Sequence, residues 1–444
     1  MRKTFRYLFL LSLLLPLRCQ AELYFYPALS ASTMGTAYAS AVAGTEDITQ
    51  QFYNPAVTCY FYDHQFGVSP SFLMPKDDFT EGVGTTFRGT VLTESPELKD
   101  FAPTIGGGGI YGSIEMKKWL RLGIAITTPW RRRENFAHDW IGRYYGTRLE
   151  IMSTNITPSL AFSIRDVLCV AFGGQIDYFN LKYEEAIDFG SLGEQLAING
   201  ASAGNQDGFL NVNAADWDYG WVVGLILKPC YYIRLGVSYR SEVVHKFSFL
   251  PKFHLGNMGE QVSENNGLYK PICDGEMTIH CPHMIMAGIH YYHDCQCEFS
   301  AGLCWKAWSR GPGIRIQYSN INQPDTVLVQ DGWRDTFNIS IGGRYSSPCR
   351  NWYLRMGGMY EQNPVPTEVQ TPIFYGEENA TIAAGWGWNF CEYAYIDISW
   401  SHIFSKNPLI RQFVTTAGNE NRGDISGKIR TMSNTACFSF IAVF

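Results

Sequence analysis

The 444-residue chain has 46% hydrophobic and 15% aromatic residues, 43 glycines, 17% charged residues and a formal net charge of −6. Soluble proteins average about 25% charged residues. A composition rich in aromatic residues and glycine but poor in charge is therefore more typical of a transmembrane β-barrel than of a soluble enzyme. The small negative net charge gives no reason to expect nucleic acid as a partner.

Residues 1–21 have the pattern of a secretory signal peptide. Basic residues precede the apolar run Leu8–Leu17, and Cys19-Gln20-Ala21 provides a cleavage site. The run is too short to span a bilayer as a helix, which takes about 20 residues. We expect an exported mature chain that starts near Glu22.

From Gly67 onward the hydrophobic pattern repeats every two residues, as in β-strands. The segments 119–127, 231–243 and 337–345 each place apolar residues on one face and small or polar residues on the other. In an outer-membrane barrel the apolar face meets lipid and the polar face meets the lumen. A secreted soluble β-protein is the alternative, with the apolar face as its core.

The connections between these segments favour the barrel. Short turns alternate with long polar segments, which is the outer-membrane pattern of one tight rim and one rim of loops. The short turns are centred on Lys117, Arg165, Pro229, Asp294, Pro348 and Phe390. We predict an all-β fold, a fourteen-stranded antiparallel transmembrane β-barrel, with strands from near His64 to Phe444.

The stretch Met34–Ala56, ahead of the first strand, is small, polar and rich in glycine and alanine. Pro55 offers no N–H, and Gly35 and Gly44 permit bends. We expect a compact irregular plug inside the barrel, with a short helical turn capped by Thr45.

Several motifs in this order resemble the FadL family of outer-membrane long-chain fatty acid transporters. They are Gly35-Thr36-Ala37-Tyr38, Asn54-Pro55-Ala56, Tyr239-Arg240-Ser241-Glu242-Val243, Trp308-Ser309 and Asn363-Pro364-Val365-Pro366. The resemblance implies a signal peptide (1–21), an N-terminal hatch (22–62) and a barrel (63–444). It also implies passive, hatch-gated uptake of long-chain fatty acids or similar hydrophobic molecules across the outer membrane. The hatch residues are then Gly35, Tyr38, Asn54, Pro55 and Ala56.

The resemblance also suggests a ligand site. Arg315, seven positions after the Trp-Ser pair, matches a basic residue of the family's carboxylate site. Asn180 stands where the family has a second basic residue, and Lys182, on the same strand face, is a substitute cation. Both basic residues also have an ordinary interpretation as lumen or loop charges. The departure at Asn180 leaves a neutral substrate, such as an aromatic hydrocarbon, as an alternative ligand.

The apolar mature N-terminus, including Tyr24 and Phe25, is expected to line the ligand pocket because it would be costly to leave in water. The segment 192–197 is compatible with a helix that contributes to an outer capture groove. The run 131–133 is interpreted as a solvated loop, with attraction of anionic ligands as the alternative.

No residue spacing indicates catalysis, so we expect neither an enzyme nor a cofactor. Histidines and cysteines between positions 281 and 297 alternate along strands rather than converging, so no metal site is expected either.

Eleven cysteines follow the cleavage site, an odd number for an exported protein. Cys230, Cys295, Cys349 and Cys391 occupy short turns, and Cys59 follows the plug. We place all five near the periplasmic rim, too far apart to pair within one barrel. They suggest disulfide links to neighbouring envelope proteins, with free thiols as the alternative. The rival functions are thus a disulfide-linked structural envelope protein or adhesin, and a polar-solute porin.

Overall fold

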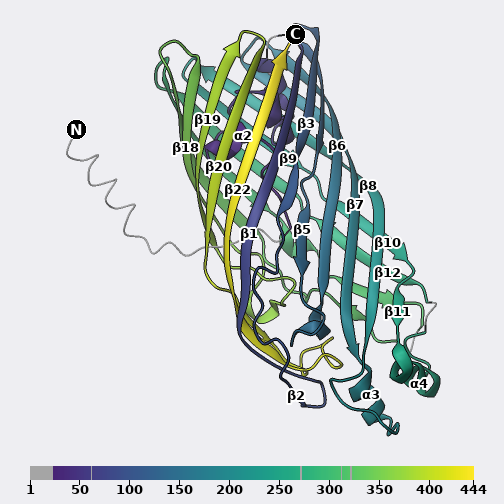
Figure 1. Ribbon diagram of the computed structural model, residues 1–444. Helices are drawn as coiled ribbons and strands as arrows, with labels where there is room; N and C mark the ends of the chain where they lie inside the picture. The colour runs from purple at the N-terminus through teal and green to yellow at the C-terminus, as the bar shows by residue number, and fades with distance from the viewer. Residues whose placement is uncertain (1–23, 62, 271–272, 312, 321–322) are drawn as a thin grey trace.

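The structure is a computed structural model that describes residues 24–61, 63–270, 273–311, 313–320 and 323–444. It is a closed, fourteen-stranded antiparallel β-barrel (Figure 1). The first strand pairs with the last along its length, from Gln65 opposite Val443 at one end to Gly84 opposite Ile425 at the other. This pairing closes the sheet. The predicted fold class is confirmed. The predicted signal peptide lies outside the described residues.

The fourteen strands are continuous or are built from two consecutive pieces. In chain order they are β1 (Gln65–Thr85), β3 (Ile105–Lys117), β4 (Leu120–Thr127) with β5 (Arg131–Asn135), β6 (Arg148–Ile164), β7 (Leu168–Asp188), β8 (Asp207–Cys230), β9 (Ile233–Arg240) with β10 (Val243–Phe249), β12 (Gly275–Cys281) with β13 (Met284–Tyr292), β14 (Cys297–Lys306), β17 (Thr336–Ser346), β18 (Trp352–Glu361), β19 (Asn379–Cys391), β20 (Ala394–Ser405) and β22 (Ile425–Val443).

The long connections carry the remaining short elements. These are β2 (Val91–Leu92), η3 (Arg143–Tyr145), α3 (Phe189–Gln195), β11 (Lys252–His254), α4 (Gly256–Asn266), η4 (Trp308–Arg310), β15 (Arg315–Tyr318), β16 (Thr326–Val327), η5 (Thr367–Val369) and β21 (Leu409–Gln412). Helix α3 overlaps the predicted helical segment 192–197. No helix in the described parts of the chain is long and apolar enough to cross a membrane.

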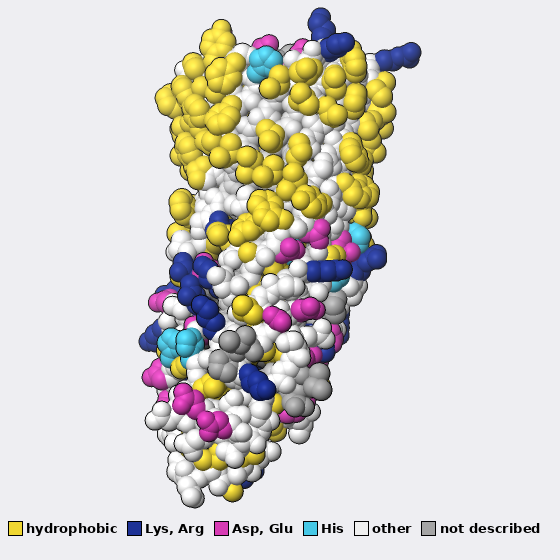
Figure 2. All heavy atoms as spheres, turned by 90° about the vertical axis from the view of Figure 1, so that its right-hand side faces the viewer, with side chains coloured by type: hydrophobic (Ala, Val, Ile, Leu, Met, Phe, Trp, Pro, Cys, Tyr) yellow, Lys and Arg dark blue, Asp and Glu magenta, His cyan; other side chains and the backbone are white. Residues whose placement is uncertain are grey.

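Large apolar side chains cover the outside of one half of the barrel, whereas charged side chains gather on the other half (Figure 2). The apolar half carries the short turns and the C-terminal end of the chain (Figure 1). An outward apolar band with short turns on one rim is the arrangement of an outer-membrane barrel. The half with the long loops therefore faces outside the cell. On β6, Met152 is the last large apolar residue to face outward on that side.

The predicted alternation holds for 119–127 and 337–345, whose apolar residues face outward. It fails in part for 231–243. Tyr231 lies in the turn between β8 and β9, and Val243 is buried because the strand breaks at Ser241-Glu242 and its phase changes there. The break is only two residues long, so the alternation in the sequence continues across it although the strand is interrupted there.

Residues 24–61, which we call the N-terminal segment, are almost entirely buried within the barrel. They form α2 (Ala31–Gly35), η1 (Ile48–Phe52) and η2 (Pro55–Tyr60). The first turn of η1 is capped by Asp47, whose carboxylate accepts from Thr49 N at 2.8 Å. The predicted cap at Thr45 is therefore wrong, since an Asp two residues later caps the turn.

Candidate functional site

A cavity lies inside the barrel between the N-terminal segment and the long loops, with about 880 Å³ of space outside protein atoms, part of which is open to solvent. Its apolar lining comes from the N-terminal segment, from β1, β3, β18 and β20, and from the connection before β3. The residues of this lining are Phe25, Pro27, Ala28, Leu73, Pro75, Ala102, Ile105, Met359 and Ile403. Pockets that bind small molecules are generally lined in this way, mainly by apolar side chains with a few polar groups.

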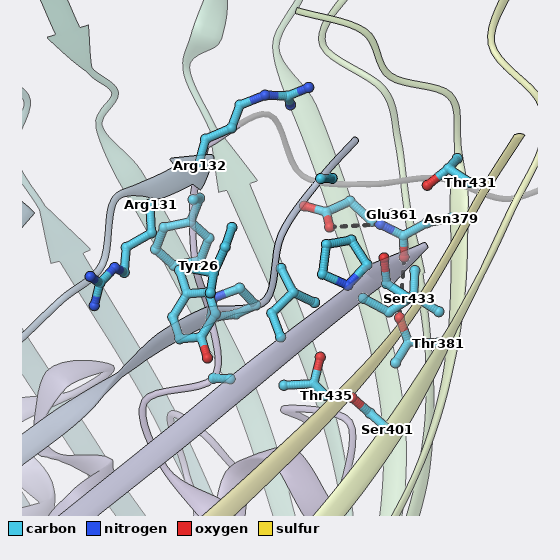
Figure 3. A pocket seen from close by; sticks show the side chains of 18 of the residues that line it. Tyr26, Arg131, Arg132, Glu361, Asn379, Thr381, Ser401, Thr431, Ser433 and Thr435 are labelled. Carbon is cyan, nitrogen blue, oxygen red and sulfur yellow. Dashed lines mark hydrogen bonds between the residues drawn. The ribbon is translucent and has the colours of Figure 1, made fainter. Parts of the chain in front are cut away.

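Hydroxyl groups also line the cavity, from neighbouring strands β19, β20 and β22. Figure 3 shows Thr381, Ser401, Ser433 and Thr435 on one side of the cavity, with Tyr26, Arg131 and Arg132 on the other. The cavity thus combines apolar side chains with hydroxyl groups and cations.

Arg132 is the buried cation of this cavity, with only 8% of its side chain exposed. Its Nη2 lies 2.9 Å from Glu134 Oε1, and its guanidinium stacks over the ring of Tyr375 at 4.6 Å. The Tyr375 hydroxyl donates to Asp77 at 2.7 Å and contacts Glu134 at 3.2 Å. Interpreting residues 131–133 as a solvated loop is therefore wrong for Arg132. The register of β5 turns Arg132 and Glu134 inward beside Ile151 and Leu149 of β6.

Burial makes the acids of this cluster hard to ionise. These residues lie beyond the apolar band, on the loop side of Met152. Burial raises the pKa of Glu134 to about 8, with Asp77 adding to the shift and Arg132 opposing it. Burial also raises the pKa of Asp77. The Arg132 guanidinium therefore lies beside carboxyl groups that resist ionisation, where it can donate hydrogen bonds to an anionic ligand.

A second cation, Lys306, contacts Phe25 and Glu361, two residues that line the cavity. Lys306 Nζ lies 2.6 Å from Glu361 Oε1 and 4.5 Å from the ring centroid of Phe25. Glu361 also accepts from Asn379 Nδ2 at 3.2 Å, and Thr381 donates to Asn379 at 3.3 Å. The Lys306–Glu361 pair neutralises itself, so Arg132 is the stronger candidate for recognising a ligand's charge.

Residues 24–26 fill an interruption of the wall. β4 pairs with β3 up to Gly109, and the chain bends at Thr128-Pro129-Trp130 before β5 continues along β6. On the free edge of β5, Tyr26 N donates to Pro129 O at 2.6 Å and Arg131 N donates to Tyr24 O at 2.8 Å. The start of the N-terminal segment thus completes the wall at this bend.

The structure places the predicted carboxylate residues away from the cavity. Arg315, on β15, pairs with Asp331 at 2.7 Å, and both side chains are substantially exposed. Asn180 and Lys182 occupy outward positions of β7, where Lys182 lies 3.6 Å from Glu150. They share strand parity with outward-facing Phe172, a signal already present in the sequence. Their role in ligand binding stays an untested prediction.

The predicted apolar N-terminus divides between two places. Phe25 lines the cavity. Tyr24 instead packs against Trp130 and Trp308, at 5.6 and 5.1 Å between ring centroids, and donates to His280 O. Tyr24 thus holds the adjacent Phe25 in position at the cavity.

Among the predicted hatch residues, Tyr38 lines both this cavity and a smaller one behind it, of about 460 Å³. Asn54 Nδ2 donates to Val42 O at 2.9 Å and to Leu225 O at 3.2 Å, which ties the segment to β8. Pro55 and Ala56 open η2, and Gly35 lies against Gly385 of β19. Tyr38 is thus the residue of this set that borders both cavities.

A disulfide joins Cys59 to Cys169 of β7. Our expectation that Cys59 lies too far from other cysteines to pair within the barrel is therefore wrong. The expectation considered only turn cysteines, whereas Cys169 faces inward near the start of a strand. Cys230, Cys295, Cys349 and Cys391 are exposed and carry free thiols. In the described residues, no three His, Cys, Asp or Glu side chains group as a metal site would require.

Ion pairs hold the middle of the N-terminal segment. Glu46 Oε2 lies 2.5 Å from Arg355 Nη2 and 3.6 Å from Arg344 Nη1. Arg355 also pairs with Asp397 at 2.5 Å. The segment is therefore fixed covalently at Cys59 and ionically at Glu46.

Comparison with known proteins agrees with this architecture. The chain is 24% identical over 394 residues to a long-chain fatty acid transport protein of Escherichia coli, covering 84% of this chain and 85% of that protein. The structure resembles a FadL homologue of Pseudomonas aeruginosa with a TM-score of 0.82, at 16% identity, covering 95% of this chain and all of that one. It resembles the toluene transporter TodX of Pseudomonas putida with a TM-score of 0.61, at 13% identity, covering 95% and 99%.

A family model of outer membrane protein transport proteins (OMPP1/FadL/TodX) matches residues 16–440, nearly the whole chain. That family consists of outer-membrane transport channels, in agreement with the barrel, the outward apolar band and the filled lumen. The chain belongs to the OMPP1/FadL/TodX family of outer membrane transport proteins.

Proposed function

We propose that this barrel takes up long-chain fatty acids or chemically similar amphipathic molecules by passive diffusion, and that the N-terminal segment is its gate. The observation that carries the proposal is the cavity beside that segment, which is lined both by apolar side chains and by the buried Arg132. An acyl chain would lie against Phe25 and Leu73, and its carboxylate would accept hydrogen bonds from Arg132. Transport of this kind needs no catalysis, so we propose no enzymatic activity.

Two observations support a gating role for the N-terminal segment. Tyr38 lines both the cavity and the smaller one beside it, together with Phe25, Pro27 and Met359. Residues 24–26 close the bend of the wall at Pro129. A shift of Tyr38 would extend the path inward, and a shift of residues 24–26 would open it sideways toward the lipid. The sideways path suits an apolar ligand because it avoids water.

The test is binding of a fluorescent long-chain fatty acid to the refolded barrel, compared with its alcohol analogue and with toluene. We expect Arg132→Ala to weaken fatty acid binding by about tenfold or more, since a hydrogen bond to a charged group contributes about 1.5–3 kcal/mol. Alcohol binding should change little.

Arg315→Ala is the matched control and should leave binding unchanged, because its exposed pair with Asp331 lies outside the cavity. Equal losses in Arg132→Ala and Arg315→Ala would refute the assignment of Arg132. Binding of toluene without the fatty acid would instead support a carrier of neutral hydrocarbons.

A structural envelope role is a second candidate, favoured by one observation. Cys230, Cys295, Cys349 and Cys391 are exposed and lie at the rim of short turns, where they can reach other molecules. Non-reducing electrophoresis of native envelopes tests this role. A monomer with the same mobility before and after reduction would exclude it.

A further inference from the structure

Inward-facing glycines form a row around the inner wall of the barrel. Six neighbouring strands each contribute one, namely Gly236 on β9, Gly288 on β13, Gly302 on β14, Gly342 on β17, Gly357 on β18 and Gly385 on β19. Gly236, Gly288 and Gly302 are direct partners across three strands, and Gly342 and Gly357 are partners across the next two. The row therefore runs across the strands.

The N-terminal segment follows this row strand by strand. Gly35 lies against Gly385, Thr36 against Gly357 and Gly342, Ala39 against Gly302, and Val42-Ala43 against Gly288 and Gly236. From residue 35 to residue 43 the segment thus crosses β19, β18, β17, β14, β13 and β9 in order. Figure 1 shows its first helix, α2, beside the β18–β20 side of the barrel.

The approach is close enough to require glycine at several of these positions. A methyl group on Gly342 would lie 2.6 Å from Thr36 O, and one on Gly302 would lie 3.3 Å from Ala39 O. On Gly357 or Gly236 it would overlap the backbone of Thr36 or Val42. Because backbone atoms stand on both sides, no change of rotamer relieves the overlap, and the segment itself has to move.

The rest of the segment is held by other means. Glu46 pairs with Arg355, and Cys59 is bonded to Cys169. A methyl group in the row would therefore lift residues 35–43 from the wall without releasing the whole segment.

We infer that these six glycines, which we call the glycine seat, are positioning residues of the gate. They determine how closely residues 35–43 lie against the barrel wall, and therefore whether the lumen is sealed when no ligand is bound. The inference rests on the proposed gating role of the N-terminal segment. It places a control of closure in the barrel wall, at positions that do not line the proposed ligand cavity, although Gly302 borders the smaller one.

The sharpest test compares two neighbours on β18. Gly357 faces the segment, whereas Gly358 faces outward, and a methyl group there has no neighbour closer than 3.8 Å. In planar bilayers or swelling liposomes, we expect Gly357→Ala to increase leakage of small sugars several-fold, and Gly358→Ala to match the wild type. Heat-modifiable migration in electrophoresis establishes that both barrels are folded. Equal leakage of the two folded variants would overturn the inference.

Gly302→Ala extends the test if Gly357→Ala does not fold, because Ala39 needs to shift only slightly there and the nearest neighbour, Ser340 Oγ at 2.8 Å, belongs to a side chain that can rotate. Its leakage should exceed that of Gly358→Ala, and amide hydrogen exchange should accelerate in residues 35–43 while β14 stays protected. Faster exchange throughout the barrel, or no change in residues 35–43, would refute the seat. Fatty acid binding measured in parallel separates the two proposals. Leakage that follows the glycines in a barrel without fatty acid binding would support the seat while refuting the ligand assignment.

Discussion

Two buried arginines of the lumen, Arg132 and Arg355, mark regions of opposite character. Arg355 is held between two carboxylates, Glu46 and Asp397, each 2.5 Å away, and it binds the N-terminal segment to the wall. Arg132 lies 2.9 Å from Glu134, whose pKa is raised by burial, and it lines the mainly apolar cavity. A cation held between two carboxylates stabilises structure, whereas one among carboxyl groups that resist ionisation, in a mainly apolar cavity, can bind an anionic ligand. The comparison predicts separable effects on closure and on binding.

The largest expected effect, on leakage through the barrel, comes from disrupting the ion pairs that hold the N-terminal segment. Arg355→Ala leaves Glu46 and Asp397 buried without their main cation, and removing one partner of a buried ion pair typically costs about 3–5 kcal/mol. We expect a barrel that leaks small solutes strongly while its fatty acid binding is largely retained. Conductance and ligand fluorescence measure the two properties on one preparation.

The control for this prediction is Glu46→Gln, which keeps the shape of the side chain and should leak less because Arg355 retains Asp397. An Arg355→Ala barrel that is as tight as the wild type would contradict the assignment of Glu46 and Arg355 as an anchor.

Much of this molecule is predictable from its sequence, and the exceptions have physical causes. Strand periodicity and short turns predict the barrel because one face of each strand meets lipid. The lumen face is harder to interpret, since buried ion pairs and exposed charges use the same residues. β5 has five residues, too few for alternation to show that Arg132 points inward. The pairing of Cys59 with Cys169 joins positions 110 residues apart, a separation that no local pattern bridges.

An intermediate effect is expected from pH at the binding region. Burial raises the pKa of Glu134 to about 8, so the carboxyl is mainly neutral at pH 7 and becomes an anion above that pKa. The anion then competes for Arg132 and repels a fatty acid carboxylate. Fatty acid affinity should fall as pH rises through 8, by at most about tenfold per pH unit for one linked proton. Titration of the fluorescent ligand between pH 7 and pH 9 measures it.

Glu134→Gln sharpens this prediction because it removes the ionisation while preserving size. Its fatty acid affinity should stay level over the same range, and the alcohol analogue should show no such pH dependence on the wild type. A fall in affinity that persists in Glu134→Gln would assign the titration to another group.

The smallest expected effect on closure comes from the covalent attachment. Cys59→Ser removes the disulfide, but Asn54 still donates to Val42 O and Leu225 O, so the end of the segment should stay near β7 and β8. We expect leakage to rise only slightly and to remain far below that of Arg355→Ala.

The effects of losing the disulfide and the ion pair on leakage should reinforce each other. Removing the disulfide from Arg355→Ala frees both ends of residues 46–59, so the double variant should leak more than the sum of the single variants. Simple addition would mean that the two attachments act independently, on separate parts of the gate.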